Sequence, residues 1–386
     1  MDERQNLKGI LIGSPFMAAI DTKGDRCDRC NCALVVNGFQ VAKGYKAYIF
    51  DNTYPAEYAK NLAAYCPDAS ILYQFPGVNE LCNGDVIEVG NEGRISFAFR
   101  GSSGDHVLFI TNRCNSNCIM CPDSDSNRRK NYGDRKEHLL RLIEMLPTDV
   151  GHITITGGEP TLLKWDLIEI LRRCKECLPN TVFLMLSNGR SLCVTEYRNA
   201  SLQSVPKNFR LAVPLYGSSE EEHDRITRSP GSFVQTLSAL RALQHYIEVE
   251  IRIVIMRNNY SKLPEIAAFI SRELPSTYTV SLMGMELLGN AANNREELWI
   301  DFEETTGFLE RTVSTLLSSG IDVRIYNYPL CALPRNLWSI AAKSISDYKV
   351  RYQENCADCQ VKSLCGGFFY STLHFEDIPI HPVLKE

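Results

Sequence analysis

The stretch "VLFITNRCNSNCIMC" (residues 107–121) joins a short apolar run to three closely spaced cysteines. The run "VLFIT" is rich in β-branched and aromatic residues, which is typical of a buried strand. Cys114, Cys118 and Cys121 follow it at once, in the spacing Cys-x3-Cys-x2-Cys. We therefore expect three thiol groups just beyond the end of a strand.

Five more apolar runs follow this one along the chain. They are "HITIT" (152–156), "TVFLML" (181–186), "FRLAVPL" (209–215), "VEIRIVI" (249–255) and "YTVSLMGMEL" (278–287). Helical patterns lie between several of them, for example over 134–146 and 261–274. Alternating strands and helices predict an α/β fold with a parallel sheet and right-handed crossovers. Six units are fewer than a closed eight-fold barrel needs, so we expect an open, partial (β/α)6 barrel.

Ligands of such folds gather at the carboxyl ends of the strands. The cysteine triple follows the first strand, "GGEP" (157–160) the second and "SNGR" (187–190) the third. Three motifs at one rim predict a single site there.

The regions flanking this barrel differ from it. Residues 1–104 carry short strands and turn signals, which predict a small β-rich module. We assign residues 105–300 to the barrel and 301–386 to an extension. That extension holds a helical pattern (302–320), a strand "DVRIY" (322–326) and a second group of cysteines.

Composition excludes several kinds of protein. The chain has 386 residues, a net charge of −5, 44% apolar and 23% charged residues. This acidic balance argues against nucleic acid as the main partner, and no apolar run is long enough to span a membrane. The N-terminus lacks the pattern of a signal peptide. Fifteen cysteines then indicate a reducing, cytoplasmic location, where clustered cysteines bind metal or do chemistry more often than they pair.

Thiolates bind soft metals, so the candidates for the triple are zinc and an iron–sulfur cluster. A structural zinc site needs four ligands, and no fourth lies close by in the sequence. A [4Fe–4S] cluster held by Cys114, Cys118 and Cys121 would keep one iron open to another ligand. An iron without a protein ligand would explain why the motif has three cysteines rather than four.

This triple after a buried strand, followed about 35 residues later by "GGEP", resembles the radical S-adenosylmethionine (SAM) enzymes. The resemblance implies that the open iron chelates the amino and carboxylate groups of SAM. One electron from the cluster then cleaves SAM to a 5'-deoxyadenosyl radical. Cys114, Cys118 and Cys121 would thus be both metal ligands and catalytic residues.

The resemblance also implies contacts to SAM from the other motifs. Gly157 and Gly158 would let the backbone approach SAM, and Glu159 would accept from its ammonium group. The remaining expected contacts are Ser187 and Asn188 with the ribose or carboxylate, and Arg228 with the carboxylate. Simple turns at Gly157-Gly158 and Asn188-Gly189 remain the alternative, and His223 and Asp224 could equally cap or pack a helix.

The second cysteine group contains Cys331, Cys356, Cys359 and Cys365. Four thiolates suffice for a closed zinc site. After a radical SAM core, however, they resemble the auxiliary iron–sulfur extensions called SPASM and twitch domains. The SPASM pattern has seven cysteines and this group has four, so we expect one auxiliary [4Fe–4S] cluster.

The chain further resembles the radical SAM maturases of the His-Xaa-Ser system, the subgroup called HxsC. The resemblance rests on stretches such as "GDVIEVGNEGRISFAFRGSSGDHVLFITNRCNSNCIMC" (84–121), "LMGMELLGNAANN" (282–294) and "IYNYPLCALP" (325–334). It implies a peptide or small-protein substrate, a sister radical SAM maturase as partner, and an electron donor such as flavodoxin or ferredoxin. The chain departs from the subgroup in "PDSDSN" after Cys121 and in "CDRCNC" near the N-terminus.

The other cysteines suggest less. Cys27, Cys30 and Cys32 form part of a metal site only if Cys66 or Cys82 completes it. Cys174 and Cys177 fit an amphipathic helix as small core residues.

Two classes of function follow. The first is an enzyme that modifies a peptide, with a small-molecule or sulfatase-type protein substrate as the alternative. The second is a non-catalytic iron–sulfur or zinc scaffold. For a peptide substrate, we expect docking at an exposed strand edge of the N-terminal module.

Overall fold

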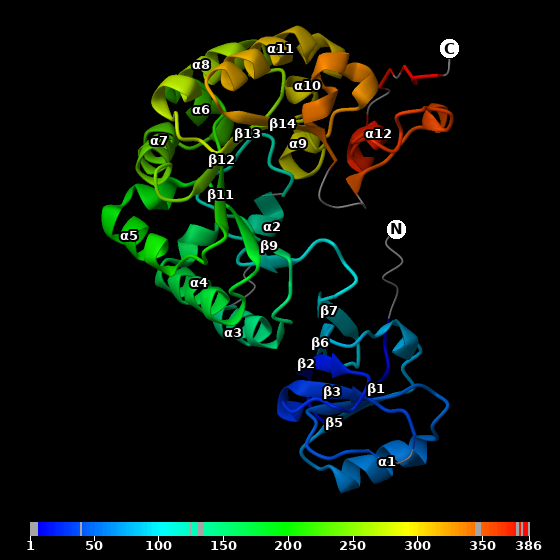
Figure 1. Ribbon diagram of the computed structural model, residues 1–386. Helices are drawn as coiled ribbons and strands as arrows, with labels where there is room; N and C mark the ends of the chain where they lie inside the picture. Colours follow the sequence, from blue (N-terminus) through cyan, green and yellow to red (C-terminus); the bar gives the residue numbers. More distant parts are fainter. Residues whose placement is uncertain are drawn as a thin grey trace. The chain divides into compact units, whose positions relative to one another are not determined.

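The computed structural model describes residues 7–38, 41–123, 125–129, 135–343, 349–375, 378–379 and 381–384 (Figure 1). The chain divides into two compact units. The first contains Met1–His106, Lys136–Gly151 and Glu176–Thr181. The second contains Val107–Arg135, His152–Lys175 and Val182–Glu386. The predicted helix over 134–146 is α3 (Lys136–Met145), and residue 134 lies outside the described residues.

The first unit is built on a mixed sheet. Its described strands are β1 (Ile10–Ile12), β2 (Phe16–Asp21), β3 (Cys32–Val35), β4 (Ala47–Ile49), β5 (Ser70–Tyr73), β6 (Val86–Val89) and β7 (Ile95–Phe99). The sheet order is β1-β5-β4-β3-β2-β6-β7. β2 to β5 pair in parallel, whereas β1, β6 and β7 pair antiparallel to their neighbours. Helix α1 (Ala56–Tyr65) connects β4 to β5. The described part of this unit is thus rich in strands.

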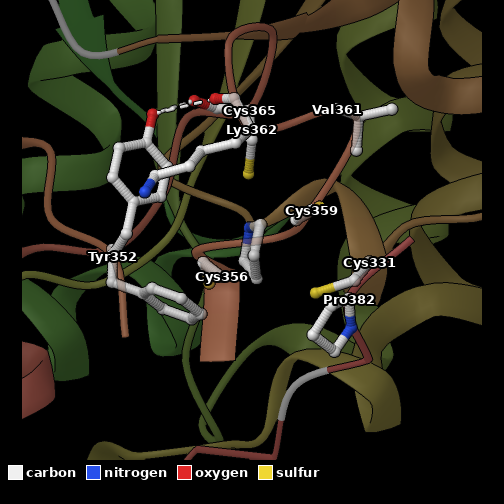
Figure 2. A pocket seen from close by; sticks show the side chains of 10 residues that line it. Cys331, Tyr352, Cys356, Cys359, Val361, Lys362, Cys365 and Pro382 are labelled. Atoms are coloured by element: carbon white, nitrogen blue, oxygen red, sulfur yellow. Dashed lines mark hydrogen bonds between the residues drawn. The ribbon is translucent and has the colours of Figure 1, made fainter. Parts of the chain in front are cut away.

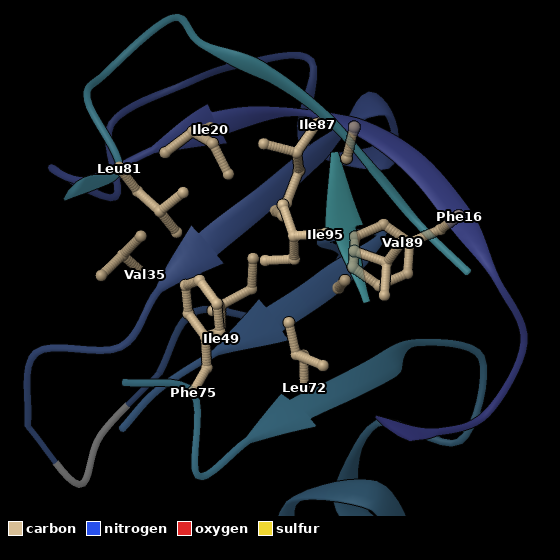
Figure 3. Packing of buried hydrophobic residues seen from close by; sticks show 13 residues of the cluster. Phe16, Ile20, Val35, Ile49, Leu72, Phe75, Leu81, Ile87, Val89 and Ile95 are labelled. Carbon is tan, nitrogen blue, oxygen red and sulfur yellow. The ribbon is translucent and has the colours of Figure 1, made fainter. Parts of the chain in front are cut away.

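Burial explains the sequence of these strands. The parallel strands β2 to β5 are buried at every position, as parallel strands covered on both faces require. β7 has buried residues at its two ends and exposed or half-buried residues between them. Figure 3 shows the resulting core, in which Ile20, Val35, Ile49, Leu72 and Ile87 interdigitate.

The two ends of this sheet order are joined. Lys8, just before β1, forms a bridge with Arg94, just before β7. The amide of Ile95 donates to the Leu7 carbonyl (2.9 Å), and that of Gly9 donates to the Gly93 carbonyl (3.0 Å). These contacts occupy part of both outer edges. The module therefore offers a peptide less free edge than the sequence led us to expect.

The second unit is built on a parallel sheet. Its described strands are β8 (Val107–Phe109), β9 (His152–Thr156), β10 (Val182–Leu186), β11 (Phe209–Pro214), β12 (Glu248–Val254), β13 (Thr279–Met283), β14 (Asp322–Tyr326) and β15 (Ala341–Ala342). They lie side by side in chain order, and every pair is parallel.

Helices connect these strands and lie mainly along one side of the sheet (Figure 1). They are α4 (Trp165–Cys177), α5 (Thr195–Ser204), α6 (Glu220–Thr227), α7 (Ser232–Leu243), α8 (Leu263–Glu273) and α11 (Phe302–Ser318). Shorter helices are α2 (Asp125–Arg129), α9 (Gly289–Asn293), α10 (Arg295–Leu298) and α12 (Tyr370–Phe375). None of the described helices combines the length and apolarity of a membrane span.

All six predicted barrel strands are confirmed, and the curled parallel sheet is the predicted fold. Within the run 278–287 the strand covers Thr279–Met283, and at Gly284 the backbone comes close to the Asn327 carbonyl. The structure also adds a feature. β14, which the sequence analysis assigned to the extension, pairs with β13 and continues the sheet. Residues beyond 301 thus share one compact unit with the barrel.

Asp21, at the end of β2, is fully buried and holds the turn that follows. Its carboxylate accepts from the amides of Lys23 (2.9 Å), Gly24 (2.7 Å) and Arg26 (3.2 Å) and from the Tyr45 hydroxyl (2.7 Å). Burial raises the pKa of Asp21, but these hydrogen bonds outweigh burial, so the net pKa lies below its usual value.

We predict that Asp21→Ala destabilises β2 and β3 by about 2–3 kcal/mol, because it leaves buried donors unpaired. Since the folded-state pKa is lowered, the Asp21 contribution is present above the unfolded-state pKa. It is lost as the pH falls through the folded-state pKa. Hydrogen exchange of peptides covering 16–36 measures both effects.

Asp51→Ala is the control, because Asp51 caps a similar but exposed turn at Thr53. This substitution should lower the free energy of unfolding by less than about 1 kcal/mol. Equal losses in both variants would contradict the prediction.

Candidate functional site

Cys114, Cys118 and Cys121 lie on an irregular loop between β8 and α2. The pKa of Cys114 is raised to about 11 and that of Cys118 to about 12. Burial is the main cause in both, and neighbouring thiols contribute to each rise, with Glu159 contributing at Cys114. The three thiols thus lie within electrostatic reach of one another, as ligands of one cluster must. This donor set of three thiols fits the predicted [4Fe–4S] cluster.

The glycines of "GGEP" pack directly against this loop. The amide of Gly158 donates to the Thr111 carbonyl (2.6 Å), and that of Glu159 donates to the Arg113 carbonyl (2.8 Å). A Cβ on Gly157, whose φ is +151°, would lie 2.2 Å from the Thr111 oxygen. One on Gly158 would lie 2.3 Å from the Arg113 oxygen. The close approach that requires glycine here is thus to the cysteine loop itself.

Glu159 is fully buried, and its carboxylate is surrounded by protein donors. Oε1 accepts from the Thr161 amide (2.9 Å), the Thr161 hydroxyl (2.6 Å) and the Ser187 hydroxyl (2.8 Å). Oε2 accepts from the Asn188 amide (2.6 Å). Burial raises the pKa of Glu159, and these hydrogen bonds oppose that rise. Glu159 therefore joins the second and third strand ends, and its predicted contact with the SAM ammonium stays a prediction.

The "SNGR" loop reaches back to the cysteine loop. Asn188 donates from Nδ2 to the Asn115 side chain (2.7 Å), and the Arg190 guanidinium donates to the Asn115 carbonyl and the Ser116 hydroxyl. The Ser187 hydroxyl also accepts from the Gly189 amide (3.0 Å). Asn188 thus contacts the cysteine loop, and the predicted contacts of Ser187 and Asn188 with SAM stay a prediction.

Two further segments hold the cysteine loop from the other side. The amides of Asn117 and Ile119 donate to the last residues of α6, namely the carbonyls of Thr227 (3.1 Å) and Ile226 (2.9 Å). Helix α9 begins beside Cys121, whose carbonyl accepts from the Asn290 amide (2.9 Å).

The segment 223–233 serves mainly to build the fold. The Asp224 carboxylate accepts from the Ser232 hydroxyl (2.6 Å) and the Phe233 amide (2.8 Å), so it caps the start of α7. His223 is buried, its Nδ1 accepts from the Tyr216 amide (3.2 Å), and burial lowers its pKa to about 4. Arg228 is exposed at the end of α6, with a left-handed φ of +49°. Its predicted role toward a carboxylate stays a prediction.

Apolar side chains surround the inner side of the cysteine loop. Cys118 packs against a buried cluster drawn from its own loop, from the segments after β11, β12 and β13, and from α6, α9 and α10: Ile119, Met120, Tyr216, Ile226, Met256, Met285, Leu287, Ala291 and Leu298. A dry surrounding of this kind strengthens electrostatic interactions with a bound group.

The second cysteine group converges in the structure. Cys331, Cys356, Cys359 and Cys365 line one pocket together with Tyr352 and Lys362 (Figure 2). The Cys365 thiol accepts from the amides of Leu330 and Gly367 (both 3.3 Å).

Burial raises the pKa values of Cys331 and Cys356 in this pocket. Four convergent thiols fit four ligands of an auxiliary cluster. That cluster stays a prediction.

The N-terminal cysteines do not form such a group. Cys27 and Cys30 are exposed, whereas Cys32 lies buried in β3, where burial raises its pKa to about 12. The Cys66 thiol faces the Tyr48 hydroxyl (3.4 Å), and Cys82 is exposed. Within the described ranges, no three His, Cys, Asp or Glu side chains are gathered as tightly as one metal ion requires.

The sequence analysis missed residues that hold the cysteine loop by side-chain contacts. Arg190 directly follows the "SNG" turn, and this position next to a predicted site motif could have indicated its role in the site. Asn290 donates to the Cys118 carbonyl (2.9 Å), and Asn294 donates to the Ile119 carbonyl (2.8 Å). No local pattern indicates these two contacts, because they join positions more than 170 residues apart.

Residues 108–270 match the sequence model of the Radical SAM superfamily, so this stretch is a radical SAM domain. The match covers β8 to α8 and includes the cysteine triple, "GGEP" and "SNGR".

Curated relatives match parts of the chain. A probable GTP 3',8-cyclase of Saccharolobus islandicus is 28% identical over 158 residues, which are 40% of this chain and 49% of that protein. The sporulation killing factor maturation protein SkfB of Bacillus subtilis is 24% identical over 200 residues, 51% of this chain and 46% of that protein. The chain thus spans about half the length of these curated relatives.

Among solved structures, Streptococcus suis SuiB bound to its precursor peptide SuiA is similar to this chain. It has 12% sequence identity and a TM-score of 0.45, over 57% of this chain and 48% of that one.

We predict that Gly158→Ala lowers cluster loading, because the new Cβ would displace the backbone of Arg113 and with it Cys114. After anaerobic reconstitution, iron and sulfide per chain should fall to about half of the wild-type content. Gly307→Ala is the matched control, since its Cβ would meet nothing within 4 Å on helix α11. Full loading of the Gly158→Ala protein would contradict this role of the glycine.

Proposed function

We propose that this chain, whose residues 108–270 are a radical SAM domain, is a maturase that modifies a ribosomally made peptide or small protein. The observation that carries the proposal is the placement of three thiols beside the "GGEP" and "SNGR" loops, at the carboxyl ends of parallel strands. When bound, a [4Fe–4S] cluster with one open iron would supply the reductive cleavage of SAM to a 5'-deoxyadenosyl radical.

The chain's own residues provide the frame for this chemistry. Cys114, Cys118 and Cys121 would hold the cluster. Gly158 and Arg190 fix the loop that carries them. The apolar cluster around Cys118 would exclude water from the reacting groups.

We further propose that Cys331, Cys356, Cys359 and Cys365 hold an auxiliary [4Fe–4S] cluster. Their convergence on one pocket supports this assignment (Figure 2). A sister radical SAM maturase as partner, flavodoxin or ferredoxin as electron donor, and a cytoplasmic location belong to the same proposal.

A peptide substrate is supported by the resemblance to the His-Xaa-Ser maturases and by the relative SkfB, a maturation protein. A small-molecule substrate is the second candidate, because another relative is a probable GTP 3',8-cyclase.

One prediction of this proposal concerns the two iron–sulfur clusters. Reconstituted wild-type protein should hold about eight iron atoms, and the Cys114/Cys118/Cys121 triple alanine variant about four. With dithionite and SAM, only the wild type should form 5'-deoxyadenosine. The double variant Cys174→Ala/Cys177→Ala is the matched control and should behave as wild type, since it removes another Cys-x2-Cys pair on α4. Bound zinc, or no cleavage of SAM by the loaded wild-type protein, would favour the scaffold alternative.

The second prediction concerns the substrate. A synthetic peptide with three His-Gly-Ser repeats should change mass when incubated with reduced, loaded protein and SAM. Mass spectrometry measures the product, and omission of SAM is the control. SAM cleavage that leaves this peptide unchanged, but consumes GTP instead, would refute the peptide assignment.

A further inference from the structure

The strands β11 to β14 have two chemically different faces. One face is apolar and at most 1% exposed, and consists of Leu211, Val213, Val249, Ile251, Ile253, Val280, Leu282, Val323 and Ile325. The other face carries the charged and polar residues Arg210, Glu248, Glu250, Arg252, Thr279, Ser281, Asp322, Arg324 and Tyr326, together with the apolar residues Ala212, Pro214, Val254 and Met283. We call it the polar face. Parallel strands packed on both sides are apolar on both. Packing alone therefore does not account for the charged residues of this face.

Each arginine of the polar face has a carboxylate partner. Arg252 donates from Nε to Glu250 (2.7 Å), and Ser281 donates to the same Glu250 oxygen (2.8 Å). The other two pairs are Arg210–Glu248 (2.9 Å) and Arg324–Asp322 (3.4 Å). Within the described strands, the three arginines and three carboxylates of this face therefore cancel in formal charge.

The polar face extends along the strands in both directions. At their amino ends it meets a cavity of about 630 Å³, lined by Arg210, Glu248 and Tyr278 among others. This volume is typical of ligand sites. At the carboxyl ends, Tyr216 lies within electrostatic reach of both Arg252 and the thiols of Cys118 and Cys121.

Arg252 is positioned to contact a ligand. Its side chain is 22% exposed, whereas that of its partner Glu250 is 5% exposed. The guanidinium uses only Nε for its bond to Glu250, and its two terminal nitrogens have no hydrogen-bond partner among the described residues. Glu250 thus holds the guanidinium through Nε and leaves its terminal nitrogens as donors for another group.

The charge balance distinguishes between substrate classes. A nucleoside triphosphate carries several negative charges and needs cations that are not already neutralised. A polypeptide chain is a neutral row of alternating donors and acceptors. Paired arginines and carboxylates offer both donors and acceptors without net charge, which suits the polypeptide.

We propose that the polar face binds the substrate, that this substrate is a polypeptide segment rather than a polyphosphate, and that Arg252 donates to its carbonyl oxygens. This inference rests on the proposed function and names the surface that serves it.

Calorimetry on reconstituted, SAM-loaded protein tests the charge argument with GTP as the probe. Wild type should bind GTP no more tightly than about 1 mM. Glu250→Gln keeps the acceptor for Ser281 but removes the charge beside Arg252, so it should strengthen GTP binding about tenfold. Tight GTP binding by wild type, or unchanged binding by Glu250→Gln, would overturn the charge argument.

The same measurement with the His-Gly-Ser repeat peptide tests Arg252. Arg252→Gln should weaken peptide binding about tenfold and leave SAM affinity within about twofold. Arg272→Gln is the matched control, because Arg272 forms a similar pair with Glu273 on helix α8. Weakened SAM binding instead would assign Arg252 to the SAM carboxylate, and unchanged peptide binding would refute its role. If wild type binds no peptide, the proposed function fails, whereas the GTP measurement still decides the charge argument.

Discussion

The main-chain hydrogen bonds of the cysteine loop are the constraint on which the candidate site depends. The loop is irregular, so it cannot satisfy its own peptide groups as a helix does. Partners come from the segment after β9, where Gly158 and Glu159 donate to it, and from the end of α6, which follows β11. A third partner is Asn290 of α9, which follows β13. The thiols can therefore take their positions only when these strands are already side by side in order.

Much of this arrangement could be predicted from the sequence, and for a physical reason. Each barrel strand is a short run rich in apolar residues, and the three motifs follow successive strands at one edge. The position of β14 could not be predicted, because "DVRIY" alternates in a way that fits either a sheet strand or a separate extension. The contacts of Arg190, Asn290 and Asn294 with the cysteine loop were also missed, since only the folded chain brings these residues together.

Glu159 shows how a motif can have a different immediate role from the one its family resemblance suggests. Its carboxylate accepts from Thr161, Ser187 and Asn188, and thereby ties the second and third strand ends together. An unpaired carboxylate buried this deeply would be costly, and these donors offset that cost. The loop that should meet SAM is thus rigid before SAM arrives. Such preorganisation lowers the ordering cost of binding.

In the proposed reaction the cluster needs an apolar surrounding, whereas the substrate needs a polar surface. The second unit provides the two in different places. Around Cys118 the side chains are apolar, which raises the thiol pKa values and requires that protons leave when a metal binds. On the polar face, charges are kept but paired. Pairing matters because an unpaired Arg252 in a half-buried position would bind anions indiscriminately and carry its own desolvation cost. Held by Glu250, the guanidinium keeps two directed donors at little net charge. A neutral polar surface of this kind would hold the proposed peptide by many weak, exchangeable contacts, which would let a modified product leave after the reaction.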